Sequence, residues 1–154
     1  LHLSIRRQRQ MCIRDSNLGG LGYLGIDIVH IPTFAEQLEL PGSRFAHVFT
    51  DRERRACAAK ANPAASLAAR WAAKEAYLKA WSNSLYGHPP VITADEVNFA
   101  EIEVVADAFG RVVIALRGHM STVAPQAASL SISHDGDYAV AVCATAACPD
   151  GHGR

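Results

Sequence analysis

Two carboxylates and an amine occur at positions suited to chemistry. Asp27 interrupts the apolar, β-branched segment 23–29, where a bare carboxylate is costly to bury and must be paired, placed near a strand end or bound to a cation. Glu75 and Lys79 lie four residues apart in a segment with helical periodicity. Carboxylates on different elements suit Mg²⁺, which typically binds one or two of them together with phosphate oxygens of a substrate. The pattern predicts metal-assisted chemistry on a phosphate anhydride.

Further cations and a hairpin end supply candidate anion-binding groups. Arg70 and Lys74 lie on the same helical segment, where basic residues would neutralise a pyrophosphate. His134 directly precedes the turn Asp135-Gly136, where an imidazole or a backbone N–H can meet an anion. The alternatives are an aspartate on an exposed strand edge, a solvated helix with an i,i+4 salt bridge and a histidine exposed at a hairpin end.

Composition indicates one folded domain and argues against several classes of protein. The chain has 154 residues, of which 49% are hydrophobic and 19% charged, so it can form a core and is too apolar for general disorder. Its 15 basic and 15 acidic residues balance, which argues against a polyanion-coating protein. No apolar run approaches the roughly 20 residues that cross a bilayer. The four cysteines form no CxxC pair, which predicts free thiols and a cytoplasmic location.

The two ends of the sequence differ from its middle. Residues 1–16 are Arg-rich and aperiodic and lack the apolar stretch of a secretory signal peptide. They include the string MCIRDS, which resembles a translated sequencing adapter, so we expect a non-native leader. Residues 19–146 are expected to form the domain and residues 147–154 a frayed tail.

Local patterns place the candidate residues on an α+β domain. Thr50 and Glu53 have the spacing of a capping box, and Asn62-Pro63 supplies a cap and a first-turn proline for the next helix. Strands are expected at residues 23–29, 102–105, 112–116, 130–133 and 138–143, and helices at about residues 32–40, 50–60, 64–81 and 118–128. Helices early in the chain and antiparallel strands later predict an antiparallel sheet with helices packed on it.

Five sequence blocks occur in the order typical of one family. The chain contains GIDIVHIPTF, FTDRERR, RWAAKEAYLKAW, FGRV and SISHDGDYAVAV, and over residues 22–144 it resembles the holo-acyl-carrier-protein synthases, which are short 4′-phosphopantetheinyl transferases. The resemblance implies Mg²⁺-dependent transfer of the 4′-phosphopantetheine arm of coenzyme A (CoA) to a serine of an acyl carrier protein or domain. Adenosine 3′,5′-bisphosphate would be released. It also implies the 4′-phosphopantetheinyl transferase fold and a homotrimer with active sites at the subunit interfaces.

The same resemblance implies roles for individual residues. Asp27 and Glu75 would bind Mg²⁺, and Lys79 would stabilise charge on the CoA pyrophosphate. Five residues would hold the phosphates and adenosine of CoA: Arg70, Lys74, Arg111, Ser133 and His134. A neutral serine needs a base, and both Glu75 and a metal-bound water are candidates for that role.

One departure from the family pattern concerns the carrier protein. Thr33 stands where many members have an arginine, so carrier recognition is expected to use other cations, such as Arg44, Arg52, Arg54 and Arg55. The string IPTFAEQ resembles actinobacterial members. The alternative function is a CoA-binding module without turnover, or a fragment of a larger synthase, and a carrier protein that gains no phosphopantetheine mass would favour it.

Overall fold

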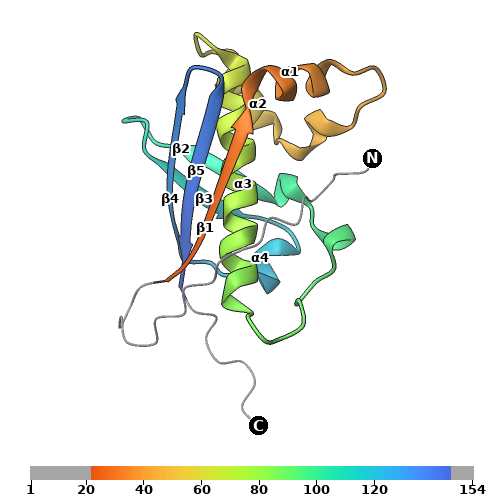
Figure 1. The fold of residues 1–154 in the computed structure, drawn as a ribbon, viewed down its shortest axis with the longest axis vertical. Helices are drawn as coiled ribbons and strands as arrows, with labels where there is room; N and C mark the ends of the chain where they lie inside the picture. Colours follow the sequence, from red (N-terminus) through yellow and green to blue (C-terminus); the bar gives the residue numbers. More distant parts are fainter. Residues whose placement is uncertain (1–21, 147–154) are drawn as a thin grey trace.

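The computed structural model describes residues 22–146, so the leader and the tail predicted at residues 1–16 and 147–154 lie outside the described residues. The elements follow in the order β1 (Tyr23–His30), α1 (Ile31–Glu39), η1 (Phe45–Val48), α2 (Asp51–Ala58), α3 (Pro63–Ser84), η2 (Ala94–Glu96), η3 (Phe99–Glu101), β2 (Ile102–Ala106), β3 (Val112–Leu116), α4 (Met120–Val123), β4 (Ala128–Asp135) and β5 (Tyr138–Thr145). Figure 1 shows them arranged around the long helix α3. No helix in residues 22–146 is long and apolar enough to span a membrane.

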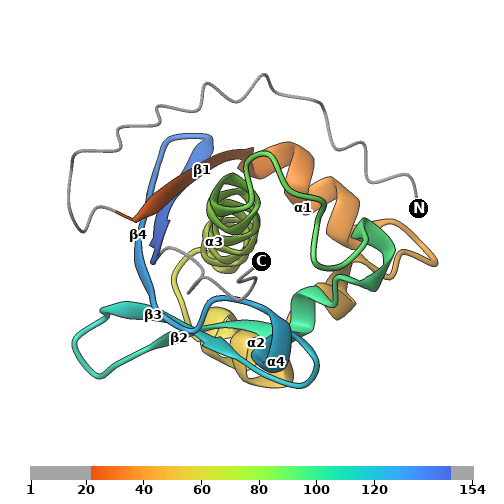
Figure 2. The same cartoon turned by 90° about the horizontal axis from the view of Figure 1, so that it is seen from below.

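Two antiparallel sheets lie against α3. One has the strand order β1-β5-β4, and the other is the pair β2-β3. In the first sheet Asp27 is opposite Ala141, which is opposite Ile132, so these residues form one row across the three strands. Ala141 is buried and packs in one core cluster with residues of α3. The face that carries Asp27 therefore points toward α3, and Figure 2 shows the two sheets on different sides of this helix.

The helix α3 is the centre of the core. The Asn62 side chain caps it by accepting a hydrogen bond from the Ala65 N–H at 3.0 Å, and Pro63 occupies the first turn. Most of its buried residues are alanines, which have the highest helix propensity and add little bulk. The larger side chains divide between two clusters, with Tyr77 among the strands and Trp71 among the aromatic residues of α1 and η1. Alanine packing therefore lets neighbouring elements approach α3 from several sides.

Strand β1 approaches α3 most closely at Gly25. A Cβ atom placed on Gly25 would lie 2.0 Å from the Ala76 carbonyl oxygen and 2.5 Å from the Ala80 nitrogen, so only glycine fits. Asp27 follows two residues later on the same face of the strand, since side chains alternate. The close approach therefore brings the Asp27 carboxylate to the helix surface that carries Glu75 and Lys79.

Most predicted elements are confirmed, with shifted ends. Both hydrogen bonds of the capping box between Thr50 and Glu53 are present. The Ala-rich helix extends to Ser84, beyond the predicted end at residue 81. The helix predicted over residues 118–128 is wrong in length: α4 ends at Val123, and Ala124 is extended because it precedes Pro125.

The strands confirm an antiparallel arrangement but divide into two sheets instead of one. The predicted hairpin is present, although β4 continues through Asp135, and the turn therefore consists of Gly136 and Asp137. Gly136 has a φ of 52°, which glycine adopts without strain. Cys57 and Cys143 are free, as predicted, and both are buried; the other two cysteines lie outside the described residues.

The Gly25→Ala variant tests the close approach of β1 to α3. The added methyl group meets backbone atoms that cannot move aside, so we expect it to lower the free energy of unfolding by about 3 kcal/mol or more. Gly42→Ala is the control, because its methyl group meets nothing within 4 Å. Its only cost is the strain of an alanine at a φ of 74°, about 1 kcal/mol. Urea unfolding measures both, and equal losses would contradict the predicted clash.

Candidate functional site

Side chains of β1 and α3 meet at one place near the surface. The Lys79 Nζ atom lies 2.7 Å from the Asp27 Oδ1 atom and also donates to the Ile26 carbonyl oxygen at 3.0 Å. About a fifth of each side chain is accessible, with 24% exposure for Lys79 and 16% for Asp27. Glu75 lies one helical turn before Lys79 and on the same side of α3. The structure therefore brings together the three residues that the sequence analysis predicts to be catalytic.

The charges at this place are poorly balanced. Burial and the neighbouring charge of Asp27 raise the pKa of Glu75 from 4.5 to about 7, although Lys79 opposes the change. Burial also raises the pKa of Asp27, against the hydrogen bond and the charge of Lys79. One ammonium group thus serves two carboxylates, and the site would accept another cation.

The donor set fits Mg²⁺. Within residues 22–146 no group of three or more His, Cys, Asp or Glu side chains could hold a metal, so a site built only from protein ligands is not present there. Two carboxylates with open positions suit a hard divalent cation that keeps several waters and binds substrate phosphates. Asp27 and Glu75 supply these carboxylates, and the repulsion between their charges provides the electrostatic reason for cation binding.

Lys74 points into the protein instead of toward this site. Its side chain has no exposed surface, and its Nζ atom donates to the Glu53 Oε2 atom and to the Phe99 carbonyl oxygen, each at 2.9 Å. Burial lowers the pKa of Lys74, against the charge of Glu53. The expected contact of Lys74 with a CoA phosphate is therefore corrected: its ammonium group already has internal partners and is closed to solvent.

Arg70 is also buried, but part of its guanidinium group lacks a partner. One terminal nitrogen donates to the Ser66 Oγ atom at 2.9 Å and to the Ser66 carbonyl oxygen at 3.3 Å. The Nε atom is buried and has no hydrogen-bond partner among residues 22–146. A buried donor without a partner is costly, so the Nε–H group of Arg70 would be stabilised by a hydrogen bond to an anion.

The other predicted CoA contacts lie elsewhere in the chain. Arg111 is exposed at the end of the β2–β3 hairpin, where its Nε atom lies 2.6 Å from the Asp107 Oδ2 atom. Ser133 and His134 lie near the end of β4, two strands from β1. The side chain of Ser133 is on the sheet face opposite to that of His134, because side chains alternate. Within one chain these three residues are not gathered around Asp27.

Sequence reasoning missed the role of Gly25. A glycine inside a strand pattern is a signal for close backbone approach, and GIDIV contains one two residues before Asp27. It also missed the partner of Lys74. Glu53 is 21 residues away along the chain, and its spacing from Thr50 already explains it as part of a capping box.

Sequence comparisons give a consistent result. The family model of the 4′-phosphopantetheinyl transferase superfamily matches residues 23–143. The holo-[acyl-carrier-protein] synthase of Corynebacterium efficiens is 51% identical over 127 residues, which cover 78% of this chain and 90% of the relative. The synthase of Mycobacterium ulcerans is 46% identical over 125 residues, which cover 80% and 95%.

Solved structures agree in fold. The Chronobacterium ammoniagenes ACPS-CoA complex matches with a TM-score of 0.77 and 50% identity over 82% of this chain and 98% of its own. The acyl carrier protein synthase of Mycobacterium tuberculosis matches with a TM-score of 0.66 and 40% identity, covering 84% and 100%. The predicted α+β fold is thereby confirmed. The chain belongs to the 4′-phosphopantetheinyl transferase superfamily, within its holo-[acyl-carrier-protein] synthase family.

Proposed function

We propose that this chain transfers the 4′-phosphopantetheine arm of CoA to a serine of an acyl carrier protein or domain in a Mg²⁺-dependent reaction in the cytoplasm. The observation that carries this proposal is the convergence of Asp27, Glu75 and Lys79 at one accessible place. It is supported by relatives named holo-[acyl-carrier-protein] synthase and by the similarity to a structure described as an ACPS-CoA complex.

Each residue of this group has a role that its surroundings support. Asp27 and Glu75 would hold Mg²⁺, which when bound would neutralise charge on the CoA pyrophosphate and orient it. Lys79, which donates to Asp27 in this structure, can donate to the same pyrophosphate and stabilise charge on the departing group. Arg70 would donate its buried Nε atom to a phosphate oxygen of CoA once its side chain turns outward.

The reaction is an exchange of one phosphorus–oxygen bond for another. The serine oxygen bonds to the phosphorus that carries the pantetheine arm, the pyrophosphate bond breaks, and adenosine 3′,5′-bisphosphate leaves. A base must take the serine proton. The raised pKa of Glu75, about 7, suits a base at neutral pH, whereas a carboxylate that binds a metal is weaker in that role, so Glu75 and a water are both candidates.

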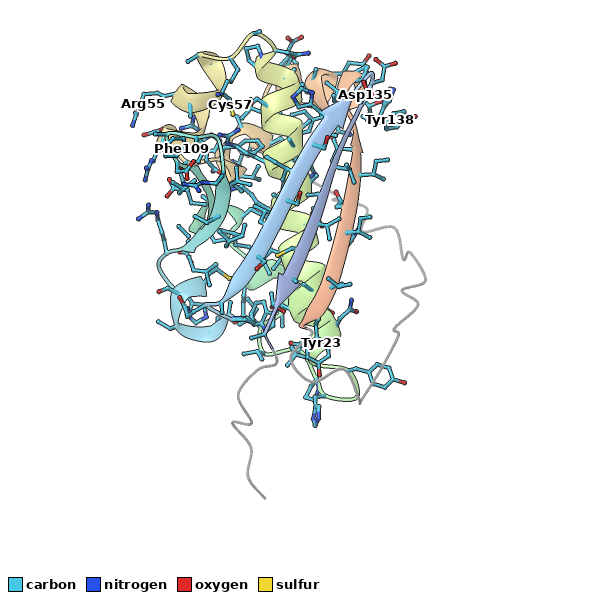
Figure 3. The ribbon with its side chains drawn as sticks, turned by 90° about the vertical axis from the view of Figure 1, so that its left-hand side faces the viewer. Tyr23, Arg55, Cys57, Phe109, Asp135 and Tyr138 are labelled. Atoms are coloured by element: carbon cyan, nitrogen blue, oxygen red, sulfur yellow. The ribbon has the colours of Figure 1, made fainter. Side chains whose placement is uncertain are left out.

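We also propose that the enzyme is a homotrimer assembled through the outer face of the three-stranded sheet. Leu24, Ile26 and Ile28 project from this face and are 62%, 60% and 58% exposed. Figure 3 shows this sheet from the side opposite to α3, between Tyr23 at one end and Tyr138 at the other, with no described element in front of it. Exposed apolar surface of this kind marks an interface. Assembly would supply Arg111, Ser133 and His134 from a neighbouring subunit.

Glu75→Gln tests the catalytic group. The amide keeps the size of the side chain but removes a negative ligand, so turnover should fall by roughly 10²–10⁴-fold. The assay incubates the apo carrier protein with CoA and Mg²⁺ and follows the gain of the phosphopantetheine mass. Asp95→Asn is the matched control, because Asp95 is an exposed acid in η2. Near-normal turnover of Glu75→Gln would remove this residue from the mechanism, and CoA binding by the wild type without transfer would favour the non-catalytic binding module.

Mg²⁺ binding should depend on pH through Glu75. Because the folded-state pKa of this carboxyl lies above its ordinary value of 4.5, its contribution to the stability of the metal-free protein is lost as the pH rises from about 4.5 through 7. Mg²⁺ must displace the proton at low pH, so the increase in melting temperature on adding Mg²⁺ should be larger at pH 8 than at pH 6. Thermal unfolding at both pH values measures it. The same increase at both values, or one retained in Glu75→Gln, would argue against metal binding at Glu75.

Ile26→Asp tests the assembly. A charge in the centre of the apolar outer face should convert the trimer to a monomer and abolish arm transfer, because each site would lose its neighbour's residues. Val113→Asp is the control, since Val113 is 53% exposed on β3 of the other sheet. Light scattering gives the mass of each variant. A wild-type protein that is already monomeric and active would contradict the trimer.

A further inference from the structure

A second group of charged side chains lies inside the protein, between α3, α2 and β2. The Lys74 Nζ atom and the Glu53 Oε2 atom are 2.9 Å apart, and neither side chain has exposed surface. Glu103 is also buried, accepts a hydrogen bond from the Thr50 hydroxyl at 2.8 Å and pairs with Arg117. Four charged residues therefore form one network apart from the site described above.

Glu53 connects separate elements of the fold. Its Oε1 atom accepts a hydrogen bond from the Val104 N–H of β2 at 2.9 Å, and its Oε2 atom accepts one from the Thr50 N–H at the start of α2, also at 2.9 Å. The ammonium group of Lys74 donates a hydrogen bond to the same Oε2 atom and another to the Phe99 carbonyl oxygen. The ion pair thereby attaches α3 to α2, β2 and η3 at a single point along the helix.

That point is one residue before Glu75. Consecutive side chains leave a helix about 100° apart, so Lys74 faces α2 and β2 while Glu75 faces β1. A rotation of α3 by about 20° would move a carboxyl group roughly 6 Å from the helix axis by about 2 Å. Misplacement of a catalytic group by about 1 Å can already reduce a rate about 10²-fold.

We propose that the Lys74–Glu53 ion pair fixes the rotation of α3 and thereby positions Glu75 opposite Asp27. Lys74 is then a positioning residue, acting through its neighbour on the helix and not through CoA. This inference rests on the proposed function of Asp27 and Glu75. It differs from a role in stability alone, because a buried ion pair can often be replaced by neutral groups without loss of stability.

The test replaces the ion pair by neutral groups of similar size. Lys74→Met alone leaves the Glu53 charge buried without its partner and should lower the melting temperature strongly. The double variant Lys74→Met with Glu53→Gln removes both charges and retains an acceptor oxygen for the Val104 N–H. Its amide nitrogen cannot accept the hydrogen bond from the Thr50 N–H, so the variant should regain part of that loss. Arg117→Met is the control: it breaks the other ion pair of the network, which joins Glu103 of β2 to the residue that follows β3 and does not include α3.

We expect the double variant to fold with kcat reduced at least tenfold, while the KM for CoA changes less than twofold. Its increase in melting temperature with Mg²⁺ alone should fall to less than half of the wild-type value. Arg117→Met should keep kcat within twofold. If the double variant does not fold, Glu53→Gln alone replaces it, since it keeps the bond from Lys74 to the Phe99 carbonyl oxygen. We expect it to show the same lower kcat, the same KM for CoA and the same smaller response to Mg²⁺.

Two results would overturn the inference. A double variant with wild-type kcat and a wild-type response to Mg²⁺ would show that the ion pair serves stability only. A tenfold increase in the KM for CoA at unchanged kcat would instead favour a phosphate contact of Lys74. A wild-type protein that transfers no arm would refute the proposed function, and the response of the variants to Mg²⁺ would still decide whether the ion pair positions Glu75.

Discussion

The contact between the backbone of β1 and the surface of α3 is the constraint on which the candidate site depends. Gly25 has no side chain, and the backbone atoms of Ala76 and Ala80 lie where its Cβ atom would be, so the strand and the helix are in direct backbone contact. A larger residue at position 25 would separate the carboxylate of the strand from the carboxylate of the helix. The proposed catalytic group therefore depends on a small residue at this contact, and its charged side chains lie where the packing of β1 on α3 places them.

This packing also creates an electrostatic cost. Burial raises the pKa of both Asp27 and Glu75, the neighbouring charge of Asp27 raises that of Glu75 further, and one lysine compensates for them incompletely. Proteins tolerate such repulsion where the surrounding fold determines the geometry. Here the fold does so from two directions, by the contact at Gly25 and by the buried ion pair beneath α3. The proposed cation would then find Asp27 and Glu75 already in place.

Local signals were sufficient to predict much of this structure. The cap at Asn62, the capping box at Thr50 and the alanine pattern of α3 depend on residues a few positions apart, and all three are confirmed. Asp27, Glu75 and Lys79 were predicted as a group from their residue types and the family resemblance, and they do converge. The inward direction of Lys74 was not predicted, because its contact with Glu53 forms only through tertiary packing. Helical spacing shows which face a residue occupies but not which element covers that face.

The pairing of β1 with β5 has a consequence for the topology of the chain. Tyr23 is opposite Thr145, and a Cβ atom on Gly22 would lie 2.0 Å from the Thr145 carbonyl oxygen, so the two ends of the described chain are adjacent. The turn at Gly136 lies at the opposite end of the same sheet. A short linker between residues 22 and 146 would close the domain into a ring, and new termini could be opened in a distant loop. The catalytic fold is therefore compatible with circular permutation.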